Sequence, residues 1–343
     1  MKNYYNKKIL ITGSNGFLGK IISDEFKIFK PLLIDKSYIK KKRNKFNIDL
    51  TNFTKLEKFF FKFKPDLIIH LASEIFDLSD EEVYNKNLVA SKNIIKLSEK
   101  YKVKKIIFTS TFSLFERNYK NLIRETTKPS AFNAYALSKH KIEKLLIQSN
   151  ISTTIFRLPI ILSETRAHRM AVFFELIKND LPIFLFGNGN NKLHFVSSKM
   201  ICYCIKNSLN SKESEIYNLG VLSSLNLKTM FTKSINHLNS KSKVIIVPIS
   251  LIRFLFKILS KIKFLDFNNY HLNIFSSNIV LDISKAKKKF KLKNFNENNF
   301  DLFINSYKYY VSNYKYVKKI KSGSNKIPDM KIINFLKIFK CFF

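Results

Sequence analysis

The chain has 343 residues, of which 45% are hydrophobic and 25% are charged. This composition excludes intrinsic disorder, and the length suits roughly two domains. Its three cysteines (202, 204 and 341) exclude a fully paired disulfide framework, and their spacing fits no zinc site, so we expect a reducing compartment and no metal. The net charge of +36 can attract polyanions, but the abundance of Lys, Asn, Ile and Phe indicates compositional bias.

Short β-rich segments alternate with helical segments over the first 160 residues. The spacing predicts strands at 8–12, 31–35, 46–50, 66–71, 105–109 and 152–156. It predicts helices at 17–29, 55–63, 81–100 and 134–148. Strands separated by helices indicate right-handed crossovers and a doubly wound parallel α/β sheet. Ligands of such sheets bind beyond the carboxyl ends of the strands.

After residue 160 the alternation weakens, and helical patterns at 170–178 and 249–264 mix with short strands. We therefore expect a smaller substrate-binding lobe at 166–320, some segments of which return to the sheet. A basic and apolar tail follows at 321–343. Its residues 330–343 are too few to span a bilayer, which leaves a helix docked on the protein, a self-association patch or weak peripheral membrane contact.

The amino terminus carries no apolar stretch typical of a signal peptide. The chain also has no uncharged apolar run as long as the roughly 18 residues that a membrane span needs. These two observations predict a cytoplasmic protein.

Three of the seven glycines of the chain, Gly13, Gly16 and Gly19, directly follow the first predicted strand. A glycine turn at this place offers backbone amides and a helix N-terminus to a pyrophosphate. Asp35 follows the second strand, about 20 residues further on, where a carboxylate binds ribose hydroxyls and favours NAD over NADP. The neighbouring Lys36 argues against that preference. The alternative is a glycine turn required only for packing, with Asp35 as an ordinary cap.

Tyr135 and Lys139 are four residues apart on a predicted helix, so their side chains share a face. An ammonium beside a phenol favours the phenolate, which is a general base. The fifth strand ends in Thr109, Ser110 and Thr111, whose hydroxyls would point into the cleft. A Tyr and a Lys at this spacing are common by chance. The position of Tyr135 and Lys139 after the fifth strand of a dinucleotide-binding sheet favours a catalytic role.

Together these features resemble the extended short-chain dehydrogenase/reductases, specifically the NAD-dependent epimerase/dehydratase family. The resemblance covers about residues 7–315. The matching segments, in family order, are Thr12–Gly19, Asp35, Asp49–Leu50, His70–Ser73, Asn87, Ser110–Thr111, Tyr135–Lys139, Phe156–Pro159, Tyr217–Gly220 and Asp282–Ala286. The resemblance implies an NAD-binding Rossmann domain at 1–165.

The resemblance also implies a role for each matching residue. Thr111, Tyr135 and Lys139 would be catalytic, and Lys139 would in addition hold the nicotinamide ribose. Asp49 and Leu50 would contact the adenine end, Ala72 would line the nicotinamide side, and Asn87 would lie on the helix beneath the coenzyme. The implied coenzyme-binding residues are Gly13, Asn15, Gly16, Phe17, Leu18, Gly19, Asp35, Asp49, Leu50, Leu71, Ala72, Asn87, Tyr135 and Lys139.

The sequence departs from the family pattern in the substrate-binding segments. Family dehydratases carry Asp-Glu after the strand hydroxyl, where this chain has Phe112 and Ser113, so a 4,6-dehydratase is disfavoured. The acidic residues common in the substrate lobe are replaced by Ser197 and Ser198. Ser110, Lys192 and His194 are candidate substrate contacts, although Lys192 and His194 are equally compatible with surface roles.

The sequence therefore predicts an NAD-dependent epimerase that oxidises and re-reduces one carbon of a nucleotide-diphosphate sugar. The first alternative is a reductase or dehydrogenase of the same family, acting on a sugar nucleotide or another alcohol. The second is a non-catalytic dinucleotide-binding scaffold. The resemblance implies a homodimer, and neither nucleic acid nor a metal is expected as a ligand.

Overall fold

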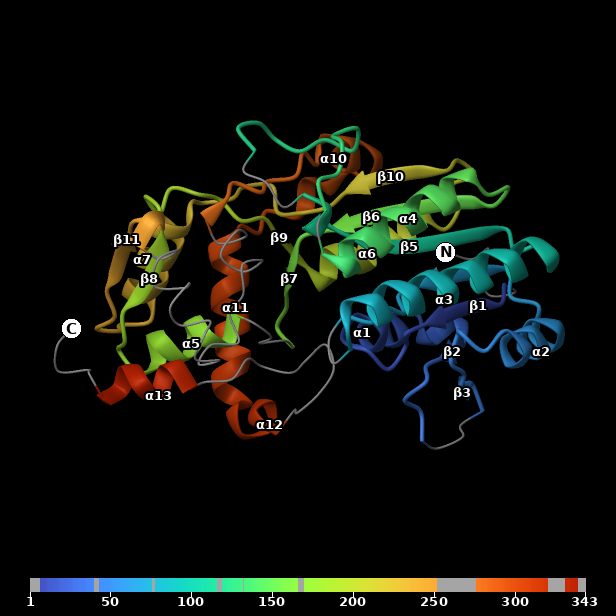
Figure 1. Ribbon diagram of the computed structural model, residues 1–343, viewed down its shortest axis with the longest axis horizontal. Helices are drawn as coiled ribbons and strands as arrows, with labels where there is room; N and C mark the ends of the chain where they lie inside the picture. The colour runs from blue at the N-terminus through green and yellow to red at the C-terminus, as the bar shows by residue number, and fades with distance from the viewer. Residues whose placement is uncertain are drawn as a thin grey trace.

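The computed structural model describes residues 7–39, 43–75, 78–115, 119–131, 133–165, 170–251, 276–319 and 331–338. Most of the helix expected at 249–264, and the ends of the tail, lie outside this range. Figure 1 shows a sheet domain on one side and a smaller helical lobe on the other.

A seven-stranded sheet in the order β10-β6-β5-β4-β1-β2-β3 forms the centre of the larger domain. All of its pairings are parallel. The strands are β1 (Ile9–Thr12), β2 (Leu32–Ile34), β3 (Lys45–Phe46), β4 (Leu67–His70), β5 (Lys105–Thr111), β6 (Ser152–Leu158) and β10 (Glu215–Asn218). The order reverses at β1, which lies between β2 and β4, and a ligand crevice is expected at such a reversal. The predicted doubly wound Rossmann-type fold is confirmed.

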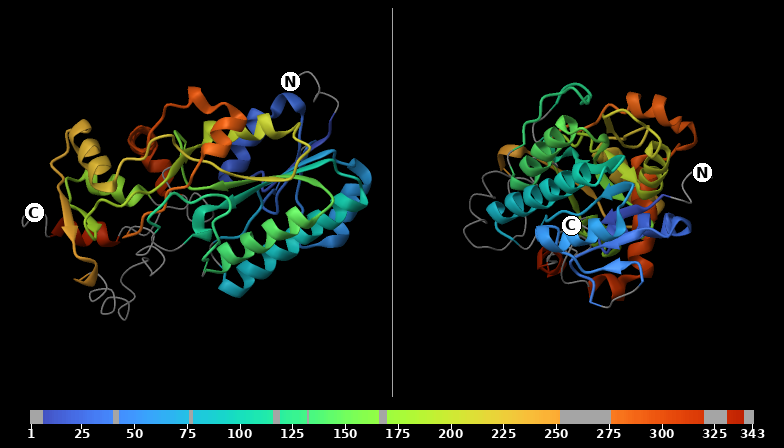
Figure 2. Two further views of the ribbon diagram at one scale, coloured as in Figure 1. Left: turned by 90° about the horizontal axis from the view of Figure 1, so that it is seen from above. Right: turned by 90° about the vertical axis from the view of Figure 1, so that its right-hand side faces the viewer.

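Helices cover both faces of this sheet (Figure 2). The helices are α1 (Phe17–Glu25), α2 (Phe53–Phe63), α3 (Asp80–Lys100), α4 (Ala134–Gln148), α6 (Ser198–Ser208) and α10 (Ser284–Phe290). Ile9 and Ile11 pack in one apolar cluster with α1, α6 and α10, whereas Leu10 packs with α2, α3 and α4. This alternation follows from the two-residue period of a strand and explains why the strand sequences are apolar throughout.

The lobe has its own apolar core, which includes Phe174, Phe231 and Phe303. Its elements are α5 (Ala171–Lys178), β8 (Ile183–Phe186), α7 (Leu227–His237), β11 (Val244–Val247), α11 (Asn299–Ser312), α12 (Tyr314–Lys318) and α13 (Lys331–Ile338). The short parallel pair β7 (Ile160–Leu162) and β9 (Phe195–Ser197) connects the lobe to the sheet domain. Ala136 of α4 belongs to the same core, so the lobe packs against the start of that helix.

The tail helix α13 docks on the lobe. Ile333 and Leu336 are buried in the lobe core, and α13 contacts α5. The described part of the tail is therefore a helix docked on the protein, which is one of the roles expected for it. Ile333 and Leu336 are buried in the lobe and are not available to contact a membrane. No helix within the described ranges is both long and apolar enough to cross a bilayer.

Apart from small shifts of boundaries, the chain-order predictions differ from the structure in β3, α1 and β10. Strand β3 ends at Phe46 rather than Leu50, because Thr51 donates two hydrogen bonds to the Asp49 carboxylate and closes a turn. Helix α1 ends at Glu25, followed by the 3-10 turn Lys27–Phe29. The seventh strand, β10, comes from beyond residue 160 and was not predicted individually.

A buried ion pair fastens α4 to β6. Arg157 Nε and Nη2 donate to the two Glu143 carboxylate oxygens at 3.0 and 2.7 Å. Both side chains are almost fully buried, at 4% and 3% exposure. Arg157 Nη1 also donates to the Glu125 carbonyl oxygen at 2.9 Å. The geometry is the two-bond arrangement that suits a guanidinium and a carboxylate.

We expect Arg157→Met to lower the free energy of unfolding by about 3–5 kcal/mol, because it leaves the Glu143 charge buried and unpaired. The measurement is urea denaturation followed by circular dichroism. The double variant Arg157→Met with Glu143→Leu should recover most of the loss, since it removes both charges. Lys100→Met, which breaks the exposed pair with Glu57, is the control and should stay close to wild type. A single variant as stable as this control would contradict the expectation.

Candidate functional site

The residues proposed from the sequence for the coenzyme and for catalysis gather at one edge of the sheet. Gly13 follows β1, Asp35 follows β2, Leu71 follows β4, and Thr111 ends β5. Because all these strands are parallel, their carboxyl ends lie at the same edge. Tyr135 and Lys139 lie in the first two turns of α4, which packs beside α3 on one face of the sheet.

The glycine loop is held by very close backbone packing. Gly13 has a positive φ of 67°, and a Cβ there would lie 2.6 Å from the Ala72 nitrogen. A Cβ on Gly19 would lie 2.1 Å from the Gly13 carbonyl oxygen. Both contacts are with backbone that cannot move aside, so only glycine fits at either position. Gly16 precedes α1, and no side chain caps this helix N-terminus. Backbone amides at the start of a helix are donors that can stabilise a pyrophosphate.

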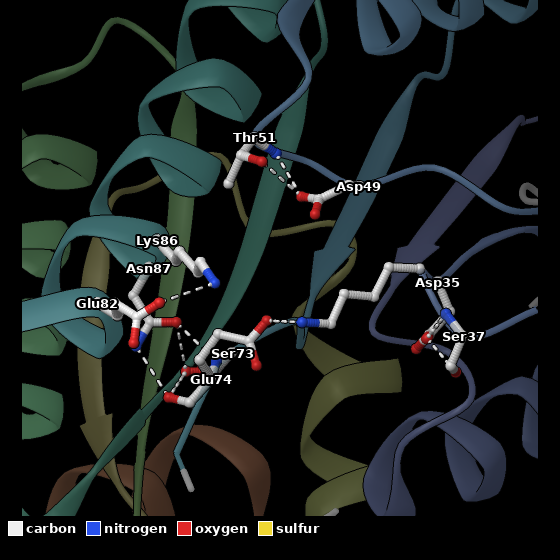
Figure 3. Close-up of polar contacts among 10 residues, drawn as sticks. Asp35, Ser37, Asp49, Thr51, Ser73, Glu74, Glu82, Lys86 and Asn87 are labelled. Carbon is white, nitrogen blue, oxygen red and sulfur yellow. Dashed lines mark hydrogen bonds and ion pairs between the residues drawn. The ribbon is translucent and has the colours of Figure 1, made fainter. Parts of the chain in front are cut away.

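Asp35 connects the glycine loop to the loop after β2. Its Oδ2 accepts a hydrogen bond from the Asn15 amide at 3.0 Å, and its Oδ1 accepts from the Ser37 amide and hydroxyl at 2.9 and 2.6 Å. A carboxylate oxygen has about two acceptor positions, so Oδ2 retains one for a ribose hydroxyl. Asn15 also donates to the Ser37 hydroxyl at 2.8 Å. Figure 3 shows Asp35 and Ser37 together, on the other side of the view from Glu74.

Asp49 and Leu50 lie at the end of the short β3 segment. The Asp49 carboxylate accepts from the Thr51 amide and hydroxyl at 2.9 and 2.7 Å. Burial alone would raise the pKa of Asp49, but the Thr51 hydrogen bonds, with Lys36 and Lys86 nearby, bring that pKa below its ordinary value. Asp49 is therefore an anion at neutral pH. Leu50 is buried in the core between the sheet and α2.

Asn87 of α3 clamps the loop after β4. Its Oδ1 accepts from the Glu74 amide at 2.7 Å, and its Nδ2 donates to the Glu74 carbonyl at 3.0 Å (Figure 3). The same Nδ2 donates to the Ser138 hydroxyl on α4 at 3.2 Å. Asn87 therefore ties the 71–75 loop to the helix that carries Tyr135. It positions the loop beside the crevice and has few polar atoms left for a ligand.

His70 is a buried hydrogen-bonding residue. Its Nδ1 lies 2.7 Å from the Thr12 hydroxyl, and its Nε2 lies 3.0 Å from the Ser91 hydroxyl. Burial, with the Lys139 charge nearby, lowers the pKa of His70 to about 3. The imidazole is thus neutral, and it links β1, β4 and α3 below the crevice.

Lys139 is buried against the end of β5. Its Nζ donates to the Thr109 carbonyl at 2.9 Å and lies 4.5 Å from the centroid of the Phe108 ring. The same atom lies 5.7 Å from the centroid of the Tyr135 ring. Burial, only partly opposed by Glu143, lowers the pKa of Lys139 to about 7. The i, i+4 spacing therefore places an ammonium beside the phenol ring, as predicted.

The hydroxyls of β5 lie at the same strand end. Thr111 Oγ1 accepts from the Ser113 amide at 3.1 Å, which leaves its hydroxyl proton available to a substrate oxygen. The Ser110 hydroxyl is buried and has no hydrogen-bond partner among the described residues. A buried polar group without a partner is uncommon and is compatible with contact to a bound ligand.

The two lobe candidates differ in exposure. Lys192 is exposed, and its backbone amide donates to the Asn278 side chain at 2.8 Å. His194 is buried, its Nδ1 accepts from the Leu281 amide at 3.1 Å, and its Nε2 donates to the Val221 carbonyl at 2.9 Å. Burial lowers the pKa of His194 to about 4. With both ring nitrogens satisfied, His194 has a packing role and no free polar atom for a diphosphate, which argues against the substrate contact expected of it.

These features fit a dinucleotide with one end at Asp35 and the other near Tyr135. The uncapped N-terminus of α1 suits the pyrophosphate, and the remaining acceptor position of Asp35 suits a ribose hydroxyl. Gly13 and Gly16 themselves carry no side chain that would obstruct the close approach that a pyrophosphate needs. The residues present therefore fit NAD.

A model of the NAD-dependent epimerase/dehydratase family matches residues 9–220, which run from β1 to the end of β10 and include every catalytic candidate. The chain belongs to this family. Its coenzyme is accordingly NAD, as the glycine loop and Asp35 predicted.

Solved structures of the same fold include several nucleotide-sugar enzymes. WbmG of Bordetella bronchiseptica, in complex with NAD and UDP, is 20% identical with a TM-score of 0.72, covering 89% of this chain and 95% of that one. UDP-glucose 4-epimerase of Thermotoga maritima, with UDP-glucose, is 19% identical with a TM-score of 0.70, covering 90% and 99%. The dTDP-glucose 4,6-dehydratase of Bacillus anthracis, with NAD, is 17% identical with a TM-score of 0.69, covering 90% and 98%. At these identities the likeness shows the fold and does not separate epimerase from dehydratase.

Two ion pairs near the site were not predicted from the sequence. They are Arg157–Glu143 and Lys36–Glu74. Glu143 follows Lys139 by four residues, and this helical spacing could have indicated that it faces the same side as Lys139 and Tyr135. Lys36 pairs with Glu74 across the loops after β2 and β4. That second contact joins separate parts of the chain, and no local pattern predicts it.

The low pKa of Lys139 makes stability depend on pH. The unfolded chain keeps this lysine protonated up to about pH 10.5, whereas the folded, coenzyme-free protein loses the proton at about pH 7. Between these values the unfolded state binds more protons, so folding becomes more favourable as the pH rises.

We expect wild type to gain stability relative to Lys139→Met between pH 7 and pH 9, measured as the free energy of unfolding in urea. Lys144→Met, on the exposed side of the same helix, is the control and should run parallel to wild type. Equal pH slopes for wild type and Lys139→Met would show that Lys139 is not deprotonated in the folded protein.

Proposed function

We propose that this member of the epimerase/dehydratase family is an NAD-dependent epimerase of a nucleotide-diphosphate sugar. The observation that carries the proposal is the side-by-side placement of the Tyr135 ring and the buried Lys139 ammonium at the carboxyl end of β5. A general base supported by a cation, next to a dinucleotide site, suits reversible oxidation of a secondary alcohol.

Tyr135, as phenolate, takes the proton of a sugar hydroxyl and later returns it. Lys139 stabilises this phenolate by its positive charge and is itself oriented by the Thr109 carbonyl. Thr111 donates a hydrogen bond to the same sugar oxygen, for which its hydroxyl proton is available. NAD, held by the glycine loop and Asp35, would supply reversible hydride transfer at the sugar carbon, so that no net oxidation would result. Rotation of the sugar between the two hydride transfers inverts the carbon.

The residues after Thr111 support epimerisation over dehydration. Elimination of water needs an acid beside the reacting carbon, and Phe112 and Ser113 occupy the 3-10 turn where a family dehydratase carries Asp-Glu. Both residues are buried and neither side chain is acidic. The 3-10 turn after Thr111 therefore supplies no acidic side chain to protonate a leaving hydroxyl group.

The substrate class is inferred from the related structures and from charge. Two of the similar proteins were solved with UDP or UDP-glucose. A net charge of +36 raises the local concentration of a doubly charged diphosphate near the protein. The exposed Lys192 of the lobe stays a candidate for contact with that diphosphate, and Ser110 stays a candidate for contact with the sugar.

We expect Tyr135→Phe to lower kcat by about 10²–10⁴-fold while leaving NAD affinity close to wild type, because the change removes only the proton acceptor. The assay incubates UDP-, dTDP- and GDP-hexoses with catalytic NAD and resolves epimers by chromatography. Tyr101→Phe, at the C-terminus of α3, is the matched control and should retain full activity.

The same assay distinguishes the rival chemistries. Epimerisation gives a product of unchanged mass and no accumulating NADH. NADH formed in step with substrate would instead identify a dehydrogenase, and a product lighter by one water would identify a dehydratase. Equal activity of Tyr135→Phe and wild type would refute the catalytic role of Tyr135 and favour a non-catalytic scaffold.

A further inference from the structure

Four carboxylate side chains, from the segments after β2, β3 and β4 and from α3, lie near the adenosine end of the proposed coenzyme site. Figure 3 shows the four carboxylates Asp35, Asp49, Glu74 and Glu82, here called the rim, together with Lys86. The whole chain has 61 Lys and Arg against 25 Asp and Glu, so an acidic rim runs against the overall charge. Lys86 is paired with Glu82 at 3.6 Å, and the pKa of Asp49 is lowered in part by Lys86 and Lys36.

Lys36 is the basic residue at this rim that directly follows Asp35 in the chain. An ammonium there is suitably placed to bind a phosphate on the ribose 2′-oxygen, which would favour NADP. Its Nζ is instead paired with the Glu74 carboxylate. Lys36 is half exposed, and Glu74 is only 26% exposed, so the carboxylate is the more sheltered partner.

Glu74 is held in place by its own backbone. Asn87, which is buried in α3, accepts from the Glu74 amide and donates to the Glu74 carbonyl at 2.7 and 3.0 Å. A lysine side chain in solvent has many rotamers, and pairing it with a fixed carboxylate confines it. The Lys36 ammonium is thereby drawn toward the loop after β4, and its charge is neutralised there.

We propose that Glu74 is a coenzyme-specificity residue, which holds the Lys36 ammonium away from the ribose 2′-position so that the chain binds NAD and rejects NADP. This inference rests on the coenzyme site of the proposed function. A 2′-phosphate would meet the carboxylate of Asp35, while the Lys36 ammonium is already paired with Glu74. The ribose of NAD, with its uncharged hydroxyls, meets an acceptor on Asp35 and no such repulsion.

The test is isothermal titration calorimetry of coenzyme-free protein with NAD⁺ and with NADP⁺. Wild type should bind NAD⁺ more tightly. Glu74→Gln should tighten NADP⁺ binding by about tenfold, because the freed ammonium gains a charge-assisted contact with the phosphate. Its NAD⁺ affinity should change little. The matched control is Glu57→Gln, which makes the same change of charge at an ion-paired glutamate of α2 remote from the rim.

The double variant Lys36→Gln with Glu74→Gln separates release of Lys36 from a general change of charge. In the double variant the gain in NADP⁺ affinity should disappear, because the ammonium that produces it is absent. The affinities of the same variants for adenosine 2′,5′-bisphosphate and for AMP should show the same pattern. These two ligands test the adenosine end alone, because they lack the nicotinamide half.

Three outcomes overturn the inference: wild type that does not prefer NAD⁺, Glu74→Gln without tighter NADP⁺ binding, or a gain that persists in the double variant. If Glu74→Gln tightens NADP⁺ binding no more than the control Glu57→Gln does, the effect reflects net charge alone, and the inference is likewise overturned. Wild type that binds NAD⁺ normally in any of these experiments leaves the proposed function standing. Wild type that binds neither dinucleotide refutes both.

Discussion

The close approach of backbone at Gly13 determines how the site is built. Because this residue has no side chain, the loop after β1 lies directly against the backbone of Ala72 after β4. Gly19 allows α1 to pack equally close to the same loop. These contacts fix the N-terminus of α1 at the point where the strand order reverses, and they leave its amides without a side-chain cap. An anion-binding position is therefore a consequence of packing that larger residues would prevent.

Around this loop the polar groups are arranged so that few charges are buried. Thr12, His70 and Ser91 form a neutral chain of hydrogen bonds beneath the crevice. Arg157 and Glu143 compensate each other. Lys139 is the exception, because its ammonium has a carbonyl as its hydrogen-bond acceptor and lies beside aromatic rings. A buried cation of this kind is costly in the coenzyme-free protein, and a neighbouring phenolate would stabilise it. The cost of burying Lys139 is thus coupled to the ionisation that catalysis requires.

The sequence predicted the elements and residues that depend on local pattern. Apolar strands, the three glycines, Asp35 and the pair Tyr135–Lys139 are each read from spacing within about 20 residues, and the fold places them at one sheet edge. It did not predict β10, whose position beside β6 depends on how the lobe returns to the sheet. It expected a ligand role for His194, whereas contacts from Val221 and Leu281, distant in the chain, occupy both ring nitrogens. The pair Lys36–Glu74 escaped notice for the same reason.

Charge affects ligand binding at two length scales. The net charge of the whole chain is positive, whereas the rim at the adenosine end is formed by carboxylates. The net charge of +36 produces a field that draws anionic nucleotides toward the surface, although salt limits its range to about 8 Å under physiological conditions. Within that range the individual side chains decide, and the carboxylates of Asp35 and Asp49 lie at the adenosine end. The amides at the N-terminus of α1 suit a diphosphate, whereas a further phosphate on the ribose would face the Asp35 carboxylate while the Lys36 ammonium is paired with Glu74. Attraction at long range therefore gives no preference for NAD, and the discrimination depends on a few paired side chains at the rim.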